Sequence, residues 1–214
     1  MNKEEIRQLK YDVKKVLESY PGLCVQYEIG IPIKLSGNLV IKDTGGNVQG
    51  EFDVEVRIPA GYPKGFPVLY ETSSKIKRID DRHIDKNGAC CVEITQRIRQ
   101  IIRNGITLQD FFKNYVHKFF CWQLLYEIDP KSVSQWEHKE DGIKQFYFEL
   151  LGTRDHKIIC CFIEAALNNH LPNRKGACIC GSGKITKKCH GGIFFDLQQI
   201  GNVQLMHDLK IFNQ

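Results

Sequence analysis

The 214-residue chain lacks any long apolar run, and its first residues, MNKEEIRQLKYDVKK, are mostly polar and charged. A bilayer-spanning helix needs about 20 mostly apolar residues, and a secretory signal peptide needs an apolar segment of its own. We therefore expect a cytoplasmic protein without a membrane partner. The chain also lacks a glycine-rich nucleotide loop, so it has no adenylation signature. It contains no internal repeat and no low-complexity tract.

A regular disulfide framework is missing too. The cysteine count is nine, an odd number, and two pairs are adjacent, Cys90–Cys91 and Cys160–Cys161. In a reducing compartment such cysteines bind metal, perform catalysis or lie in the core. Hydrophobic residues make up 42% and charged residues 26% of the chain, which is the composition of a globular protein with a real core. The length suits one domain with a small appendage.

The net charge of +5 is modest, so no single polyanionic partner is indicated. Basic residues cluster at 75–82, 97–103 and 174–188. These clusters are either solvated faces or docking sites for an acidic protein surface or nucleic acid. Acidic residues are interspersed, and no stacking motif or groove-reading helix is evident, so we expect nucleic acid to be an unlikely partner.

The hydrophobic periodicity predicts an α+β fold. An apolar stripe from Ile6 to Tyr20 predicts an opening helix, ended by Pro21-Gly22. Alternating segments predict strands over 24–33, 38–42 and 50–58, with turns at 36–37 and 43–47, and a fourth strand over 68–71. A wide apolar face after Thr107, a plausible N-cap, predicts a buried helix, and further helices are expected over 141–151 and 156–167. Four cysteines in apolar surroundings are expected in the core: Cys24, Cys121, Cys160 and Cys161.

The most informative stretch reads IPAGYPKGFPVLYE, followed after a basic connector by DRHIDKNGACCV, between Ile58 and Val92. A cysteine placed just after a glycine turn, in a loop supported by a preceding strand, can be exposed enough to attack or carry an acyl group. Thiol chemistry is therefore the leading hypothesis.

This region resembles the active site of ubiquitin-conjugating enzymes, specifically the bacterial members of that superfamily. The matching residues are Tyr62, Pro63, Phe66, Pro67, His83, Ile84, Asp85, Gly88, Ala89, Cys90, Cys91 and Val92. The resemblance implies Cys91 as the nucleophile and assigns site positions to His83 and Asp85. Asp85 stands where the eukaryotic pattern has asparagine, and an ionised carboxylate cannot donate a hydrogen bond to an oxyanion.

The resemblance continues downstream and spans roughly residues 3 to 152. Residues similar to a tail of the bacterial branch are Trp136, His138, Gly142, Phe146, Tyr147, Leu150, Leu151 and Gly152. The implied fold has an N-terminal helix, a four-stranded antiparallel meander and C-terminal helices. With a helical extension it forms a conjugating-enzyme-like domain over residues 1–168.

In the implied chemistry, Cys91 carries a protein C-terminus as a thioester and passes it to an amine. Arg82, His83 and Lys86 are candidate cations that help ionise the thiol. A proton from the amine would pass to His83, Asp85 or Glu93, or His83 is structural and pins the loop.

Cys90 leaves three alternatives open. It is a core residue, a resolving thiol that forms a disulfide with Cys91 or another chain, or itself the nucleophile.

A different chemistry is indicated after a linker at 169–176. Cys178, Cys180, Cys189 and His190 supply three thiols and an imidazole within thirteen residues. Four such ligands suit tetrahedral structural zinc, which would hold together a tail too short for its own core. The spacing resembles the SEC-C zinc motif, with Ile179 and Thr186 replacing non-ligand residues of the pattern. We predict a SEC-C-type zinc-binding tail over residues 169–214, and the resemblance implies a role in recruiting a partner.

The sequence thus predicts a cysteine-dependent acyl transferase. The expected partners are a separately encoded activating enzyme or other acyl donor, a glycine-ended protein such as a cyclic-nucleotide synthase or a ubiquitin-like protein, and an acceptor protein. The resemblance implies a bacterial antiphage operon with cyclic-oligonucleotide signalling as the setting. The alternatives are a non-catalytic binding module and a zinc-tailed adaptor with a Cys90–Cys91 redox switch.

Overall fold

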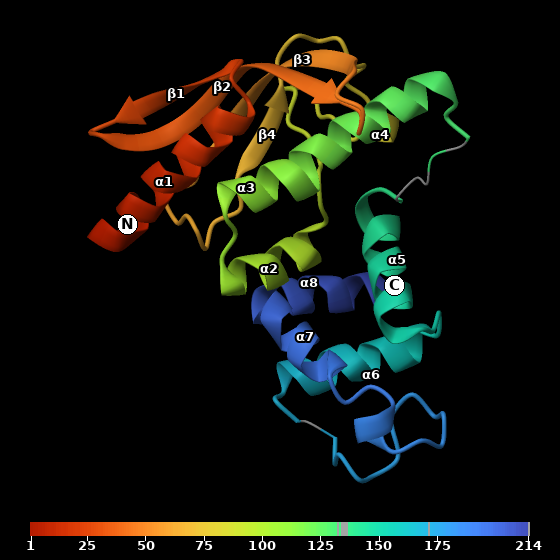
Figure 1. The fold of residues 1–214 in the computed structure, drawn as a ribbon. Coiled ribbons are helices and arrows are strands. Elements are labelled where there is room, and N and C mark those ends of the chain that lie inside the picture. Colours follow the sequence, from red (N-terminus) through yellow and green to blue (C-terminus); the bar gives the residue numbers. More distant parts are fainter. Residues whose placement is uncertain (132, 134–136, 171, 214) are drawn as a thin grey trace. The chain divides into compact units, whose positions relative to one another are not determined.

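The computed structural model describes residues 1–131, 133, 137–170 and 172–213 (Figure 1). Two compact units are present, one formed by residues 1–93 and 101–135 and the other by residues 94–100 and 136–214. The predicted tail over 169–214 belongs to the second unit, together with helices that precede it in sequence. Trp136 of the family-like tail lies outside the described residues.

The first unit contains a helix and a four-stranded antiparallel sheet in the order β1-β2-β3-β4. Helix α1 spans Lys3–Ser19, and its N-cap Asn2 forms a capping box with Glu5. The strands are β1 (Leu23–Glu28), β2 (Ile31–Lys42), β3 (Val48–Arg57) and β4 (Val68–Glu71). The opening helix, the turn at 43–47 and the fourth strand were predicted, and the α+β class is confirmed.

The first hairpin differs from the prediction, because its turn falls at Ile29-Gly30 and not at Ser36-Gly37. Ile29 and Gly30 have φ of 49° and 73°, the pair of positive values that a two-residue type I′ turn requires. Gly37 instead pairs with Leu23 inside the sheet, where an added Cβ would meet the Gly22 carbonyl oxygen at 2.3 Å. Gly37 therefore permits close approach of two strands. The turn at Ile29 was not predicted, because a β-branched residue rarely adopts a positive φ.

Helices cover one face of this sheet (Figure 1). Thr107 caps α3 (Leu108–Phe111), which continues through a π-helical turn (Phe112–Val116) into α4 (His117–Ile128). The phenylalanines of this long helix (Phe111, Phe112, Phe119 and Phe120) lie in the core, as predicted. Phe120 stacks on Phe52 of β3 with ring centroids 4.4 Å apart. The other face of the sheet carries polar groups.

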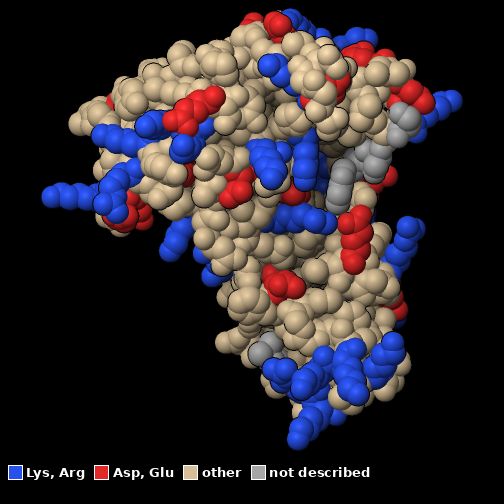
Figure 2. Space-filling view, viewed as in Figure 1, with Lys and Arg blue, Asp and Glu red and all other residues tan. Residues whose placement is uncertain are grey.

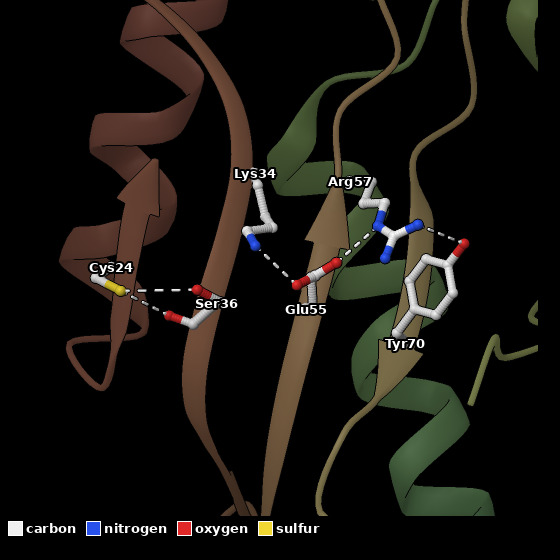
Figure 3. A network of polar contacts seen from close by, with 6 residues as sticks. All are labelled: Cys24, Lys34, Ser36, Glu55, Arg57 and Tyr70. Atoms are coloured by element: carbon white, nitrogen blue, oxygen red, sulfur yellow. Dashed lines mark hydrogen bonds and ion pairs between the residues drawn. The ribbon is translucent and has the colours of Figure 1, made fainter. Parts of the chain in front are cut away.

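On that polar face, side chains from neighbouring strands are paired (Figure 3). Glu55 accepts from Arg57 at 2.6 Å and pairs with Lys34 at 2.9 Å, and the Arg57 guanidinium lies over the ring of Tyr70. Cys24 is exposed here, with its Sγ 3.1 Å from the Ser36 carbonyl oxygen. The prediction of Cys24 as a core residue was wrong, because β1 turns this side chain away from the helices.

The second unit is mainly helical. It contains the start of α2 (Thr95–Asn104) and the whole of α5 (Lys139–Leu151), α6 (His156–Leu167), α7 (Ile193–Ile200) and α8 (Asn202–Phe212). Gly152 ends α5 with φ of 61°, as expected for a left-handed helix cap. Helices α2, α7 and α8 were not predicted. Cys160 is buried, but Cys161 is exposed, because successive helical residues face different directions.

A buried carboxylate connects the helices of this unit. Asp208 of α8 has no exposed surface and accepts hydrogen bonds from Gln96 of α2, Tyr147 of α5 and Gln204. These bonds satisfy a charge that would be costly to bury alone. Among the described residues, none of the helices has both the length and the apolar character that a bilayer span requires.

Candidate active-site turn and candidate metal centre

The segment from His83 to Cys91 forms a turn attached to the edge of β4. The Cys90 amide donates to the Leu69 carbonyl at 2.8 Å, and the Glu71 amide donates to the Gly88 carbonyl at 2.8 Å. Tyr70 and Ala89 form an isolated antiparallel bridge between these two bonds. The segment after the basic connector is therefore held by the sheet as a short extra strand.

Asp85 organises the interior of this turn. Its Oδ1 accepts from the amides of Asn87 at 2.7 Å and Ala89 at 2.9 Å, and its own amide donates to the Ala89 carbonyl at 2.9 Å. Gly88 has φ of +87°, and a Cβ there would lie 2.4 Å from the Glu71 carbonyl oxygen. The carboxylate thus acts as an acceptor that fixes the turn, a role that sequence reasoning did not assign to it.

The two adjacent cysteines point in different directions. Cys90 is 8% exposed and belongs to the apolar core, and burial strongly raises the pKa of its thiol. Cys91 is exposed, and its amide donates to the His83 carbonyl at 2.8 Å. Both are free thiols. Of the three alternatives for Cys90, the core position agrees with this burial, while Cys91 is exposed as a residue.

The electrostatic surroundings of Cys91 do not favour its thiolate. Surrounding protein partly desolvates the sulfur and raises the pKa of Cys91, and the negative charge of Glu93 raises it further. A nucleophile with a raised pKa is only weakly ionised near neutral pH. Activation would have to come from a bound partner or a rearranged neighbour.

His83 and Arg82 connect the turn to helix α4. His83 is half-buried, has φ of 53° and packs its ring edge-on against Trp122 at 5.6 Å. Arg82 was predicted as a cation beside the thiol, but its side chain is only 5% exposed and forms an ion pair with Glu127 at 2.6 Å. Its Nε donates to Gln123 at 2.7 Å. The prediction failed because α4 supplies partners that lie forty residues away in sequence.

The predicted metal ligands come together in the second unit. One ligand atom from each of Cys178, Cys180, Cys189 and His190 lies within 4.8 Å of the others. Cys180 Sγ is 3.5 Å from Cys189 Sγ, and His190 Nδ1 is 3.3 Å from Cys178 Sγ and 3.2 Å from Cys189 Sγ. Tetrahedral zinc with Zn–S bonds of 2.3 Å separates two sulfur atoms by about 3.8 Å. The four residues therefore fit a metal ion of that size.

The ligand orientation also suits a metal. His190 Nε2 is 3.0 Å from the Leu151 carbonyl oxygen, which fixes the proton on Nε2 and leaves the Nδ1 lone pair directed at the thiols. Hydrogen bonding by Ser182 and by the neighbouring thiols lowers the pKa of Cys180 to about 6. The lowered pKa favours the deprotonated, metal-binding form of Cys180, whereas burial raises the pKa of the Cys178 thiol.

A short backbone framework holds the four ligands. The Cys178 amide donates to the Lys184 carbonyl at 2.9 Å, Ala177 and Ile185 form an antiparallel bridge, and the Thr186 amide donates to the Gly176 carbonyl at 2.9 Å. A 3₁₀ turn over Thr186–Lys188 then brings Cys189 and His190 back to the first two cysteines. The loop is thereby closed around one point.

The surface of this loop is basic. Its exposed cations are Arg174, Lys175, Lys184, Lys187 and Lys188. Figure 2 shows Lys and Arg side chains gathered over this part of the second unit.

Comparison with models of known protein families and with curated proteins gives no match for the chain.

Proposed function

We propose that this chain is a ubiquitin-conjugating-like acyl transferase in which Cys91 carries the C-terminus of a protein as a thioester and transfers it to an amine. One observation carries the proposal: an exposed cysteine stands at the end of a turn that is hydrogen-bonded to β4, while its neighbour Cys90 is buried. The order of helix, four-stranded meander and later helices is compatible with that fold. The motif residues of the family-like segment support the same proposal.

In the proposed reaction, the Cys91 thiolate attacks the carbonyl carbon of an activated donor, and the donor's leaving group departs. An acceptor amine then attacks the new thioester, loses a proton, and releases Cys91 as a thiolate. Glu93, two residues from the thiol, is a candidate proton acceptor. Asp85 keeps the turn in place through its Oδ1 bonds, and His83 contributes its carbonyl to the Cys91 amide.

The partners follow from what the reaction needs. An acyl donor encoded elsewhere, such as an activating enzyme, would supply the glycine-ended protein, and a second protein would supply the amine. A cyclic-nucleotide synthase in a bacterial antiphage operon remains the proposed setting. Structural zinc at Cys178, Cys180, Cys189 and His190, in a SEC-C-like arrangement, would stabilise the loop that presents the basic surface.

The experiment is a trapping assay with the Cys91→Ser variant, the donor enzyme and the glycine-ended protein. An ester-linked adduct that survives thiol reductant in Cys91→Ser, and a reductant-sensitive adduct in the wild type, are expected. Cys90→Ser is the matched control and should still form the thioester. Absence of both adducts with an active donor present would contradict the proposal.

The raised pKa of Cys91 favours one second candidate, a binding module that uses this fold without the thiol chemistry. Asp85 agrees with this candidate, because its Oδ1 is engaged with two backbone amides and cannot donate to an oxyanion. The module would bind the same glycine-ended protein non-covalently. Equal affinity of the wild type and of Cys91→Ser, without any adduct, would identify it.

A further inference from the structure

Arg82 and Gln123 form a reciprocal, buried pair between the candidate active-site turn and helix α4. Arg82 Nε donates to Gln123 Oε1 at 2.7 Å, and Gln123 Nε2 donates back to the Arg82 carbonyl at 2.8 Å. Arg82 is 4% and Gln123 is 1% exposed. The pair thus fixes both the side chain and the backbone of residue 82.

The backbone at residue 82, which this pair holds, immediately precedes the turn that carries Cys91. The next residue, His83, adopts a left-handed conformation with φ of 53°, and its carbonyl accepts the Cys91 amide at 2.8 Å. The His83 ring lies against Trp122, the residue before Gln123 on α4. Movement of residue 82 would therefore move the acceptor that holds Cys91.

The charged guanidinium group of Arg82 contacts side chains of α4. Its Nη1 donates to Glu127 at 2.6 Å, and its guanidinium carbon lies 4.5 Å from the centre of the Tyr126 ring. Partial burial and the negative charge of Glu93 raise the pKa of Cys91. With its charge paired to Glu127, Arg82 is placed to act on the thiol through the backbone at residue 82.

We propose that Arg82 and Gln123 are positioning residues that lock the His83–Cys91 turn onto α4 and so hold Cys91 in a single exposed orientation. The functional meaning of this lock rests on the proposed role of Cys91 as the acyl carrier. The lock itself is a property of the folded chain and can be measured without a donor or acceptor.

The test measures two quantities on the full chain: amide hydrogen exchange at Cys91 by NMR, and the pH profile of Cys91 alkylation by iodoacetamide, followed by peptide mass spectrometry. Gln123→Met removes the two hydrogen bonds that the Gln123 side chain makes and keeps the contact of Arg82 Nη2 with the Gln123 carbonyl oxygen. Arg82→Lys keeps the positive charge and removes the planar fork. Arg82→Met removes the charge as well. Glu127→Gln is the matched control, because it changes only the outer ion pair, whose carboxylate side chain is 65% exposed.

We expect exchange at Cys91 to increase about tenfold in Gln123→Met and in Arg82→Lys, since one lost buried hydrogen bond corresponds to roughly that factor. Glu127→Gln should change it less than about twofold. The pH midpoint of Cys91 alkylation should stay the same or decrease in all variants, because a Cys91 thiol released from the turn becomes better solvated. Wild-type protection in Arg82→Lys and Gln123→Met would overturn the proposal.

An upward midpoint in Arg82→Met that Arg82→Lys restores would also overturn it, because this result would assign a charge effect to Arg82. Exchange of β3 amides, such as that of Phe52, is measured in the same samples to correct for global unfolding. The reported quantity is the ratio of the Cys91 exchange rate to the Phe52 exchange rate. If Gln123→Met does not fold, Gln123→Glu serves instead: it keeps an acceptor for Arg82 Nε, loses the donor to the Arg82 carbonyl and adds a carboxylate beside the guanidinium. The same rise in the Cys91 ratio is expected, and its absence would reject the lock.

These measurements separate the two proposals. If a variant loses the protection of the Cys91 amide but keeps acyl transfer, only the positioning role of Arg82 and Gln123 is refuted. A proven lock without any trapped adduct would leave the turn as a rigid recognition element and refute the transferase.

Discussion

At the residue scale, the position of one sulfur atom depends on its immediate neighbour in sequence. Cys90 and Cys91 follow each other in an extended segment, so their side chains face opposite sides, and the bond from the Cys90 amide to Leu69 directs Cys90 inward. Glycine at position 88 and a carboxylate at position 85 form the turn that precedes them. Both cysteines are recognisable in the sequence, but which one is exposed is decided by the β4 pairing.

The negative charge of Glu93 should limit the reactivity of Cys91. Because the negative charge of Glu93 raises the pKa of Cys91, Glu93→Gln should lower the midpoint of the alkylation profile and increase the alkylation rate at pH 7.5. Above the pH at which the thiol is fully ionised, both proteins should react equally. Glu149→Gln, on α5, is the control and should leave the profile unchanged. A midpoint that moves up in Glu93→Gln would contradict the sign of this charge effect.

Asp85 is predicted to serve the turn as an acceptor. Asp85→Asn keeps an oxygen for the amides of Asn87 and Ala89, so its free energy of unfolding should lie within about 0.5 kcal/mol of the wild type, while Asp85→Ala should lose about 1 kcal/mol. Urea unfolding followed by circular dichroism measures both. Equal stability of the alanine and asparagine variants would show that these two bonds contribute nothing.

At the element scale, a tyrosine from the proline-punctuated segment joins two helices. Tyr62 is 1% exposed, its hydroxyl donates to the buried Asp12 of α1, and it accepts from the Leu108 amide at the start of α3 at 2.9 Å. The Tyr-Pro motif therefore has a structural role in packing α1 and α3. Periodicity predicted both helices, but their common partner is visible only in the fold.

Tyr62→Phe should destabilise the first unit. It leaves the Leu108 amide and one Asp12 oxygen without their buried partner, which costs about 1–3 kcal/mol. Thermal unfolding of Tyr62→Phe measures this loss, and Tyr11→Phe, at an exposed position of α1, is the control with little expected change. A Tyr62→Phe protein as stable as the wild type would show that solvent or a shifted side chain replaces the bond.

At the scale of the whole molecule, each unit is assembled from separate parts of the chain. Residues 94–100 belong to the second unit, although the residues on both sides of them belong to the first. Asp208 near the C-terminus accepts hydrogen bonds from Gln96 of this inserted segment.

Removal of residues 169–214 should therefore unfold α5, α6 and the first half of α2, which limited proteolysis with mass spectrometry would detect. Persistent protection of α6 in the truncated chain would contradict this.

Zinc should be required for the stability of the second unit. Purified protein is expected to contain about one zinc per chain by elemental analysis, and chelation or Cys189→Ser should lower the melting temperature and expose the 176–190 loop to protease. Cys161→Ser is the matched control, because Cys161 is exposed and outside the cluster. Protein with well under one zinc per chain and unchanged melting after chelation would reject the metal centre.

The sequence by itself determined the α+β class, the opening helix, the buried aromatic helix after Thr107 and the candidate Cys-Cys-Cys-His cluster, because these depend on periodicity, capping and spacing within short segments. Tertiary structure alone decided the first hairpin turn, the exposure of Cys91, the burial of Arg82 against α4 and the division into two units. The physical reason is that burial and pairing depend on residues far apart in sequence, such as Arg82 with Gln123 and Gln96 with Asp208, and no local pattern encodes which partner a buried polar group will find.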